Sequence, residues 1–83
     1  MSDSIKAYIL MRTEIGSTNE VLKHLKEIEE ATRIAVTTGQ FDIVILIEVD
    51  NLEMLYDITI EKIHKIKGII ETTTMVVEKM ISI

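Results

Sequence analysis

The hydrophobic pattern of the chain is dominated by an unbroken apolar run at residues 43–47, Ile-Val-Ile-Leu-Ile. The run does not alternate with polar residues, so as a β-strand it places apolar side chains on both faces of a sheet. Both faces must then be covered. The preceding residues, Thr37 to Asp42, include a glycine and an acid and are typical of a turn. We expect the rest of the chain to be organised around this turn and this strand.

Residues 5–13 form the first expected strand, because they are rich in β-forming residues. Ala7, Ile9 and Met11 share one face of it, and Tyr8 and Leu10 share the other.

A helix is expected to follow, because Ser17-Thr18-Asn19-Glu20 has the pattern of a capping box. Apolar residues then repeat at helical spacing, at Val21, Leu22, Leu25 and Ile28, so the helix is expected to end near Glu29 or Glu30.

The β-branched residues 32–38 predict a second strand, joined by a tight hairpin around Gly39-Gln40 to the apolar third strand. A second helix is expected after Asp50, which is the predicted N-cap. Gly68 is the expected end of that helix, and residues 69–81 form the predicted last strand. One face of the second helix is marked by Leu52, Leu55, Thr59, Ile63 and Ile66.

This order, βαββαβ, predicts an α+β fold of the ferredoxin-like type: a four-stranded antiparallel sheet with two helices on one face. At 83 residues the chain is expected to be one domain, residues 1–83. The face opposite the helices is expected to be apolar as well, and large apolar surfaces are seldom left in water. The pattern therefore predicts a homodimer or a larger oligomer, with sheets packed face to face. The apolar residues expected on that open face are Tyr8, Leu10, Val44, Leu46, Ile70 and Val76.

Composition and charge narrow the function classes. The net charge is −5 and the chain has one Phe and two Tyr, so neither a basic surface for phosphates nor a stacking platform for bases is visible. Direct nucleic-acid binding is therefore not expected. No cysteine is present, and the N-terminal segment lacks the basic-then-apolar order of a signal peptide, so a soluble cytoplasmic protein is the expectation.

Two polar groups are candidates for ligand binding. A turn with a flexible glycine can expose backbone N–H groups to a carboxylate, and Asp42 beside it can accept from an ammonium group, although a plain turn with a solvated acid has the same residues. Thr72 and Thr74 place two hydroxyls on one face of a strand. These hydroxyls fit either a small polar ligand or a dimer interface, and their spacing does not decide between the two.

Catalytic and metal-binding machinery is not visible in the sequence. His24 and His64 lie on predicted helices among charged neighbours, without a second metal-ligating residue at a recognised spacing. No serine lies in a nucleophile elbow, and there is no phosphate-binding loop. We therefore expect no enzyme, no metal and no cofactor.

The chain resembles the effector-binding (RAM) domain of the Lrp/AsnC, or feast/famine, transcription regulators. The resemblance runs from Ala7-Tyr8-Ile9-Leu10 through the segment Val36-Thr37-Thr38-Gly39-Gln40-Phe41-Asp42 to the segment from Gly68 to Thr74. Its specific part is the combination of a T-G-x-aromatic-D turn with a G-apolar-x-x-T-x-T start to the last strand.

This resemblance implies dimers that pack sheet to sheet and assemble further, commonly into octamers. It implies that a free amino acid binds between dimers, without a cofactor, and that the domain acts with a DNA-binding regulator of the same family, because no helix-turn-helix domain accompanies it here. The ligand-binding residues that it implies are Gly39, Gln40, Phe41, Asp42, Thr72 and Thr74. Phe41 stands where the family often has a tyrosine.

Other functions share this order of elements. An ACT domain also binds amino acids at subunit interfaces, but its main loop usually follows the first strand, where Glu14-Ile15-Gly16 is the only candidate. A dimeric α+β barrel enzyme would need a polar side chain in a cavity between sheet and helices, where this chain is expected to place Ile, Val, Leu and Met. A ligand-free assembly module, in which the threonines join subunits, is the remaining alternative.

Overall fold

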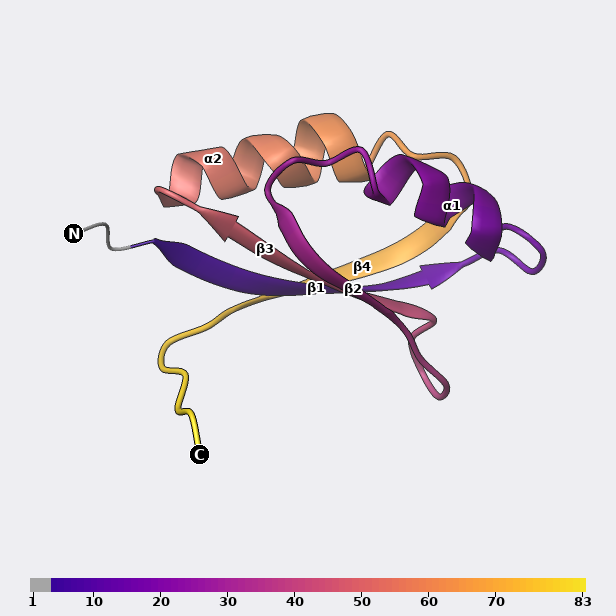
Figure 1. The fold of residues 1–83 in the computed structure, drawn as a ribbon. Coiled ribbons are helices and arrows are strands. Elements are labelled where there is room, and N and C mark those ends of the chain that lie inside the picture. Colours follow the sequence, from indigo (N-terminus) through magenta and orange to yellow (C-terminus); the bar gives the residue numbers. More distant parts are fainter. Residues whose placement is uncertain (1–3) are drawn as a thin grey trace.

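The structure is a computed structural model that describes residues 4–83. It has four strands, two α-helices and a short π-helical stretch, η1, that continues the second helix (Figure 1). In chain order the elements are β1 (Ile5–Thr13), α1 (Thr18–Leu25), β2 (Ala31–Val36), β3 (Ile43–Val49), α2 (Leu52–Asp57), η1 (Ile58–Ile63) and β4 (Ile69–Val76).

The strands form one antiparallel sheet in the order β2-β3-β1-β4, which confirms the predicted ferredoxin-like fold. The helices lie together on one face of the sheet (Figure 1). β1 and β3 are the two central strands, and Ile9 of β1 pairs with Ile45 of β3. The unbroken apolar run therefore lies in a central strand, β3, which has β2 on one side and β1 on the other.

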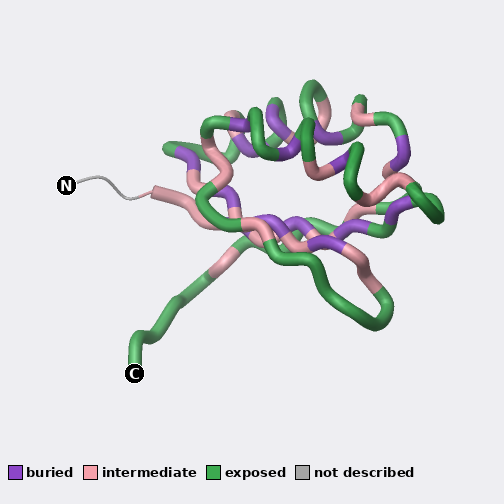
Figure 2. Tube along the Cα trace, turned by 45° about the vertical axis from the view of Figure 1, so that its right-hand side comes forward, coloured by how far each residue is buried: buried purple, intermediate pink, exposed green. Residues whose placement is uncertain are grey.

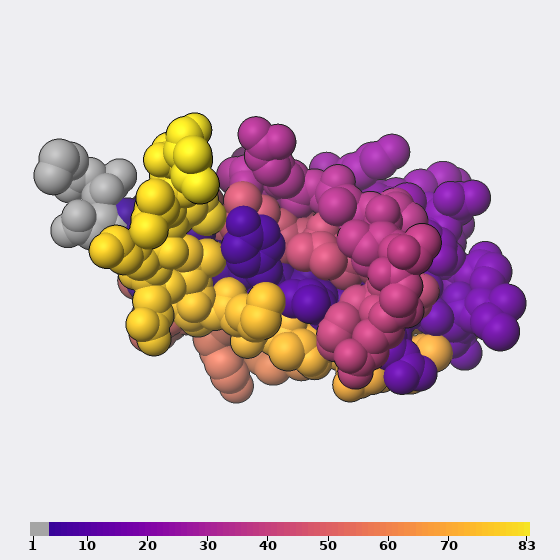
Figure 3. Space-filling view, turned by 90° about the horizontal axis from the view of Figure 1, so that it is seen from below, coloured from indigo at the N-terminus to yellow at the C-terminus, as the bar shows by residue number. Residues whose placement is uncertain are grey.

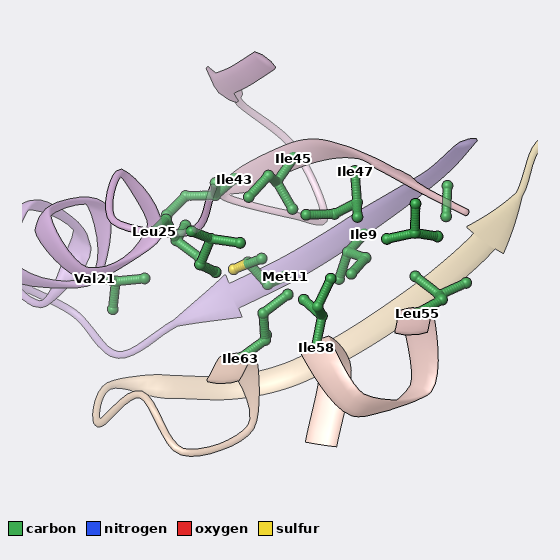
Figure 4. Close-up of a cluster of buried hydrophobic side chains, with 13 residues drawn as sticks. Ile9, Met11, Val21, Leu25, Ile43, Ile45, Ile47, Leu55, Ile58 and Ile63 are labelled. Atoms are coloured by element: carbon green, nitrogen blue, oxygen red, sulfur yellow. The ribbon is translucent and has the colours of Figure 1, made fainter. Parts of the chain in front are cut away.

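The core fills the space between the sheet and the helices. Residues of β1 and β3 point toward those of α1, α2 and η1, and the buried parts of the two layers face one another (Figures 2 and 4). The apolar residue types that were expected there, Ile, Val, Leu and Met, occupy this space. The core residues are Ala7, Ile9, Met11, Val21, Leu25, Ile28, Ile43, Ile45, Ile47, Val49, Leu55, Ile58 and Ile63.

The first helix is shorter than predicted, because it ends at Leu25 rather than near Glu29 or Glu30. After Lys26 the backbone bonds span three residues, from Glu27 N to His24 O and from Ile28 N to Leu25 O, both at 3.1 Å. This tighter winding ends the α-helix and still brings Ile28 into the core. The predicted capping box was also wrong, since Ser17 has helical backbone angles and makes no side-chain cap.

The second helical segment begins one residue later than predicted, with Asn51 as its N-cap: Asn51 Oδ1 accepts from Met54 N at 2.8 Å. Its buried face also differs from the predicted one. Leu52 is exposed, and Ile58 takes the buried position that had been assigned to Thr59. Ile58 and Ile63 are both buried although they are five residues apart, a spacing that the wider turns of a π-helix accommodate.

The last strand ends at Val76 instead of continuing to residue 81. Val77 N donates a hydrogen bond to Lys6 O, near the first residue of β1, and beyond this bond the chain leaves the sheet. The predicted face of Val76 was wrong, because Val76 pairs with Ala7, whose side chain is buried under the helices. Ile70 lies in a β-bulge, where the register shifts between the Arg12–Glu71 and Thr13–Ile69 pairs.

The sheet face opposite the helices is left open in the single chain. Tyr8 and Leu10 of β1 lie beside Leu46 and Val44 of β3 on this face, and all four are half-buried. Figure 3 shows the face from below, with residues 77–83 in yellow at one end. That segment leaves the sheet on the open side and exposes Met80 and Ile81 (Figure 1).

No helix within residues 4–83 is long and apolar enough to cross a membrane.

Gly68 joins the turn after η1 to β4 and packs against α1. Its φ of +105° is in the region that favours glycine, and its carbonyl accepts from Glu14 N at 2.8 Å. A Cβ at this position would lie 3.0 Å from Ser17 Cβ and 3.1 Å from Val21 Cγ2. The close approach of this turn to α1 therefore requires glycine.

Gly68→Ala is expected to lower the free energy of unfolding by about 3 kcal/mol, from backbone strain and from the clash with α1. Gly39→Ala is the matched control, because Gly39 has a φ of +106° but open space around it, and it should cost about 1.5 kcal/mol. Urea unfolding of both variants measures the difference. Equal losses would show that contact with α1 does not constrain Gly68.

Candidate functional site

The candidate turn connects β2 to β3 at one end of the sheet. It spans residues 37–42 and is wider than the predicted tight hairpin, because β2 stops at Val36. Thr37 closes the turn: its N donates to Asp42 O and its Oγ1 donates to Phe41 O, both at 2.9 Å. Thr38, Gly39 and Gln40 are exposed at its tip. The turn is thus held at its base, and its tip is open to a ligand or to another subunit.

Asp42 fixes the base of the turn to the end of β1. Its Oδ2 accepts from Thr13 N at 2.8 Å and from Thr13 Oγ1 at 3.4 Å, and its own N donates to Met11 O at 2.9 Å. A charged acceptor makes the bond to Thr13 N a strong one. The structure thus gives Asp42 a structural role in the single chain, while its bonds to Thr13 employ only one of the two carboxylate oxygens.

Thr13 links this turn to the first helix. Its side chain is buried, and its Oγ1 lies 3.1 Å from Thr18 Oγ1 at the start of α1. This role was not predictable from the sequence, because a threonine at the end of a strand reflects ordinary β propensity. The turn, the end of β1 and the start of α1 therefore share one hydrogen-bonded cluster.

Thr72 and Thr74 lie on the same face of β4, as their spacing predicted. Their register partners on β1 are Met11 and Ile9, so both threonines are on the helix-covered side, at the edge of the sheet. Thr74 is exposed, and Thr72 Oγ1 lies 3.1 Å from His64 Nε2. In the sequence, His64 was considered only as a possible metal ligand. Sequence spacing missed its contact because the π-helical turn changes which residues face β4.

One chain does not bring the two predicted groups together. The strand β1 separates β3 from β4. Met11 of β1 pairs with Ile43, the first residue after the turn, on one side and with Thr72 on the other. Two strand spacings put the backbones of Asp42 and Thr72 about 10 Å apart. In addition, the turn bends away from the helices, whereas the threonines lie on the helix side (Figure 1).

Elsewhere, the described part of the chain shows no group of three or more His, Asp or Glu side chains that could hold a metal ion. One ion pair lies near the site: Arg12 Nη1 is 3.4 Å from Glu71 Oε1, and both side chains are about half exposed. Exposed pairs of this kind contribute little to stability.

Asp42→Ala is expected to lower the free energy of unfolding by about 2 kcal/mol, because Thr13 N and Thr13 Oγ1 lose their acceptor. Asp42→Asn is the matched control, since its amide oxygen can still accept from Thr13 N, and it should retain more than half of that stability. Urea unfolding at neutral pH measures both. If the two variants were equally stable, Asp42 would not fix the turn to β1.

Comparisons with known proteins place the chain in a family. A family model described as the Lrp/AsnC ligand binding domain matches residues 6–82. The HTH-type transcriptional regulator FL11 of Pyrococcus abyssi is 36% identical over 76 residues, which are 92% of this chain and 50% of FL11. This chain therefore spans about half the length of that relative.

Solved structures show the same fold. The crystal structure of FFRP-DM1 superposes with a TM-score of 0.84 at 34% identity, and the match covers 88% of this chain and 97% of that one. The transcriptional regulator NMB0573 of Neisseria meningitidis, solved in complex with L-Met, has a TM-score of 0.87 at 12% identity, covering 94% of this chain and 52% of that one. The second likeness concerns the fold alone.

The effector domains of this family of transcriptional regulators are not enzymes. On the family match over nearly its whole length, and on the agreement in fold, this chain belongs to the Lrp/AsnC ligand-binding domain family.

Proposed function

We propose that this chain is an amino-acid-sensing effector domain, which binds a free amino acid between dimers and acts with DNA-binding regulators of the Lrp/AsnC family. Gly39, Gln40, Phe41 and Asp42 contact the amino acid from the turn. Thr72 and Thr74 contact it from β4. The protein works in the cytoplasm, where its regulator partners bind DNA.

The observation that carries this proposal is the turn at residues 37–42. Its base is fixed by Asp42 and Thr37, and its tip is exposed. Gly39 has open space around its Cα, so a ligand can approach the backbone there. An anchored turn with an exposed tip and a carboxylate at its base offers an acceptor to the ammonium end of an amino acid.

The placement of the two groups supports binding between subunits. Within one chain β1 lies between Asp42 and Thr72. The turn bends away from the helices, whereas Thr72 and Thr74 lie on the helix-covered side of the sheet (Figure 1). We therefore infer that the turn and the threonines that grip one amino acid come from different protomers. Occupancy of the site is then coupled to assembly.

The open sheet face supports the dimer within this proposal. Its centre is apolar, with Tyr8, Leu10, Val44 and Leu46, and its rim carries Arg12 beside Glu71 and Lys6 across from Glu48. A surface with both charge signs at its rim can complement itself across a two-fold axis. Two such faces packed together form the dimer, and dimers assemble further, with an octamer as the expected size.

The relatives supply the regulatory part of the proposal. FL11 is named as a transcriptional regulator with a helix-turn-helix, and this chain matches half of its length. NMB0573 was solved with an amino acid, L-Met. By this likeness, the chain reports amino-acid levels to a regulator through mixed assembly.

A ligand-free assembly module is a second candidate, and one observation favours it. Asp42 and Thr72 already have partners within the chain, Thr13 and His64. In that case the turn and the threonines only join subunits. The two candidates differ in their response to free amino acids.

We expect one or a few amino acids, from a panel of the twenty, to raise the thermal unfolding midpoint. An amino acid at about a hundred times its dissociation constant adds roughly 2.7 kcal/mol to the native state. Thr74→Val, which removes an exposed hydroxyl, should abolish most of this shift while the midpoint without ligand changes little. Thr73→Val is the control, because Thr73 pairs with Leu10 on the opposite face. Midpoints that no amino acid raises would favour the assembly module.

Leu46→Glu is expected to dissociate the protein to monomers at micromolar concentration, because it places a charge at the centre of the open face. Tyr56→Glu, an equivalent change at an exposed position on α2, should keep at least the mass of a dimer. Sedimentation measures both masses. A Leu46→Glu variant that still sediments as the parent assembly would show that another surface holds the dimer.

A further inference from the structure

The end of η1 and the start of β4 line a surface hollow that overlaps the predicted site at Thr72. It has a volume of about 380 Å³ and is lined by His64, Ile69, Ile70, Glu71 and Thr72. Thr72 is the only one of these residues among the predicted ligand contacts. Its hydroxyl contacts the imidazole of His64, with Nε2 and Oγ1 3.1 Å apart.

The π-helical winding explains how His64 reaches β4. His64 N donates to Thr59 O at 2.9 Å, a bond that spans five residues and widens the turn. Ile58 and Ile63 are consequently both buried, whereas an α-helix would separate residues five apart by about 140° around its axis. Because Ile63 is fixed in the core, the next residue, His64, lies at the edge of the helix layer beside Thr72. Such local widening is frequent at functional sites.

The hydrogen bond between His64 and Thr72 has two possible directions. A threonine hydroxyl has one proton to donate. If Thr72 donates it to His64, none remains for a ligand. If His64 Nε2–H donates to Thr72 Oγ1, the hydroxyl proton is free to point outward to another acceptor. An anionic oxygen in the hollow favours the second direction, because a carboxylate accepts strongly from a hydroxyl.

We propose that His64 is a positioning residue of the amino-acid site: its Nε2–H holds the Thr72 oxygen and thereby presents the Thr72 hydroxyl proton to the carboxylate of the amino acid. This inference rests on the proposed function, because it requires that Thr72 contacts the amino acid. It assigns the carboxylate end of the ligand to the hollow beside β4. The ammonium end then faces the turn at residues 37–42 of another protomer.

Ile69 and Ile70 give the same hollow an apolar wall. Ile69 is packed against the core, and the side chain of Ile70 is more than half exposed in the bulge. Glu71, the acidic residue of the hollow, is paired with Arg12, which reduces its repulsion of a carboxylate. The hollow therefore has one polar side, formed by His64 and Thr72, and one apolar side.

The test measures amino-acid dissociation constants by calorimetry on the full chain. The probes are L-leucine, L-methionine, L-lysine and L-glutamate, together with any other amino acid that raises the unfolding midpoint. His64→Ala should weaken binding about ten-fold, while the unfolding midpoint without ligand stays unchanged because His64 is exposed. His64→Gln, whose amide N–H can take the place of Nε2–H, should restore most of the affinity.

Two further variants separate positioning from other effects. Thr72→Val should weaken binding, and adding His64→Ala to it should cause no additional loss, because His64 acts only through Thr72. Lys65→Ala is the matched control, since Lys65 is exposed on the neighbouring position and pairs with Glu61. It should leave the affinity unchanged.

The outcomes distinguish this inference from the function on which it rests. If the wild-type chain binds an amino acid and His64→Ala binds it equally well, the positioning role is wrong and the proposed function stands. A loss that His64→Gln does not restore, or that adds fully to the loss in Thr72→Val, also overturns the positioning role. If the wild-type chain binds none of the twenty amino acids, both the function and the inference fail.

Discussion

The structure depends on one constraint: its two central strands are apolar on both faces. Ile43, Ile45 and Ile47 of β3 are buried beneath the helices, while Val44 and Leu46 point to the opposite side of the same strand. Two helices cover one face of the four-stranded sheet, and within residues 4–83 no helix or strand covers the other. The open face is where we propose that the hydrophobic effect acts a second time, between chains.

The same strand connects assembly to the candidate site. β3 begins where the turn at residues 37–42 ends, and Asp42 ties that turn to β1, the other central strand. Thr13 extends the cluster to the start of α1. On the far side of β1, the edge strand β4 presents Thr72 and Thr74 beside the end of η1. In the function that we propose, each chain carries two separate halves of a site, and a bound amino acid would stabilise the assembly that joins them.

The sequence predicted the architecture because the central strands have strong patterns. β1 spans the predicted residues 5–13, and β3 begins at Ile43, where the apolar run begins. The face of β4 was not predictable, because Thr72, Thr73 and Thr74 give no contrast between its two sides, and a bulge near Ile70 shifts the alternation.

The buried residues of the second helical segment were also not fully predictable from the sequence. Leu55, Thr59 and Ile63 have regular α-helical spacing, yet the chain buries Ile58 and Ile63 through a π-helical turn. Tertiary packing, and not local periodicity, selects that turn, so the contact between His64 and Thr72 could not be found from spacing. The turn residues were found because a glycine and an acid before an apolar strand are a local signal. The bond from Asp42 to Thr13 spans 29 residues and leaves no such signal.

The most direct test of this account is the dependence of unfolding on protein concentration. If the open sheet face is covered by a second copy, folding and association are linked, and a hundred-fold increase in chain concentration should stabilise the native dimer by about 2.7 kcal per mole of dimer. The urea midpoint should rise accordingly. A midpoint that stays constant over that range, with the sheet still formed, would show that a single chain is stable with this face in water and would contradict the account.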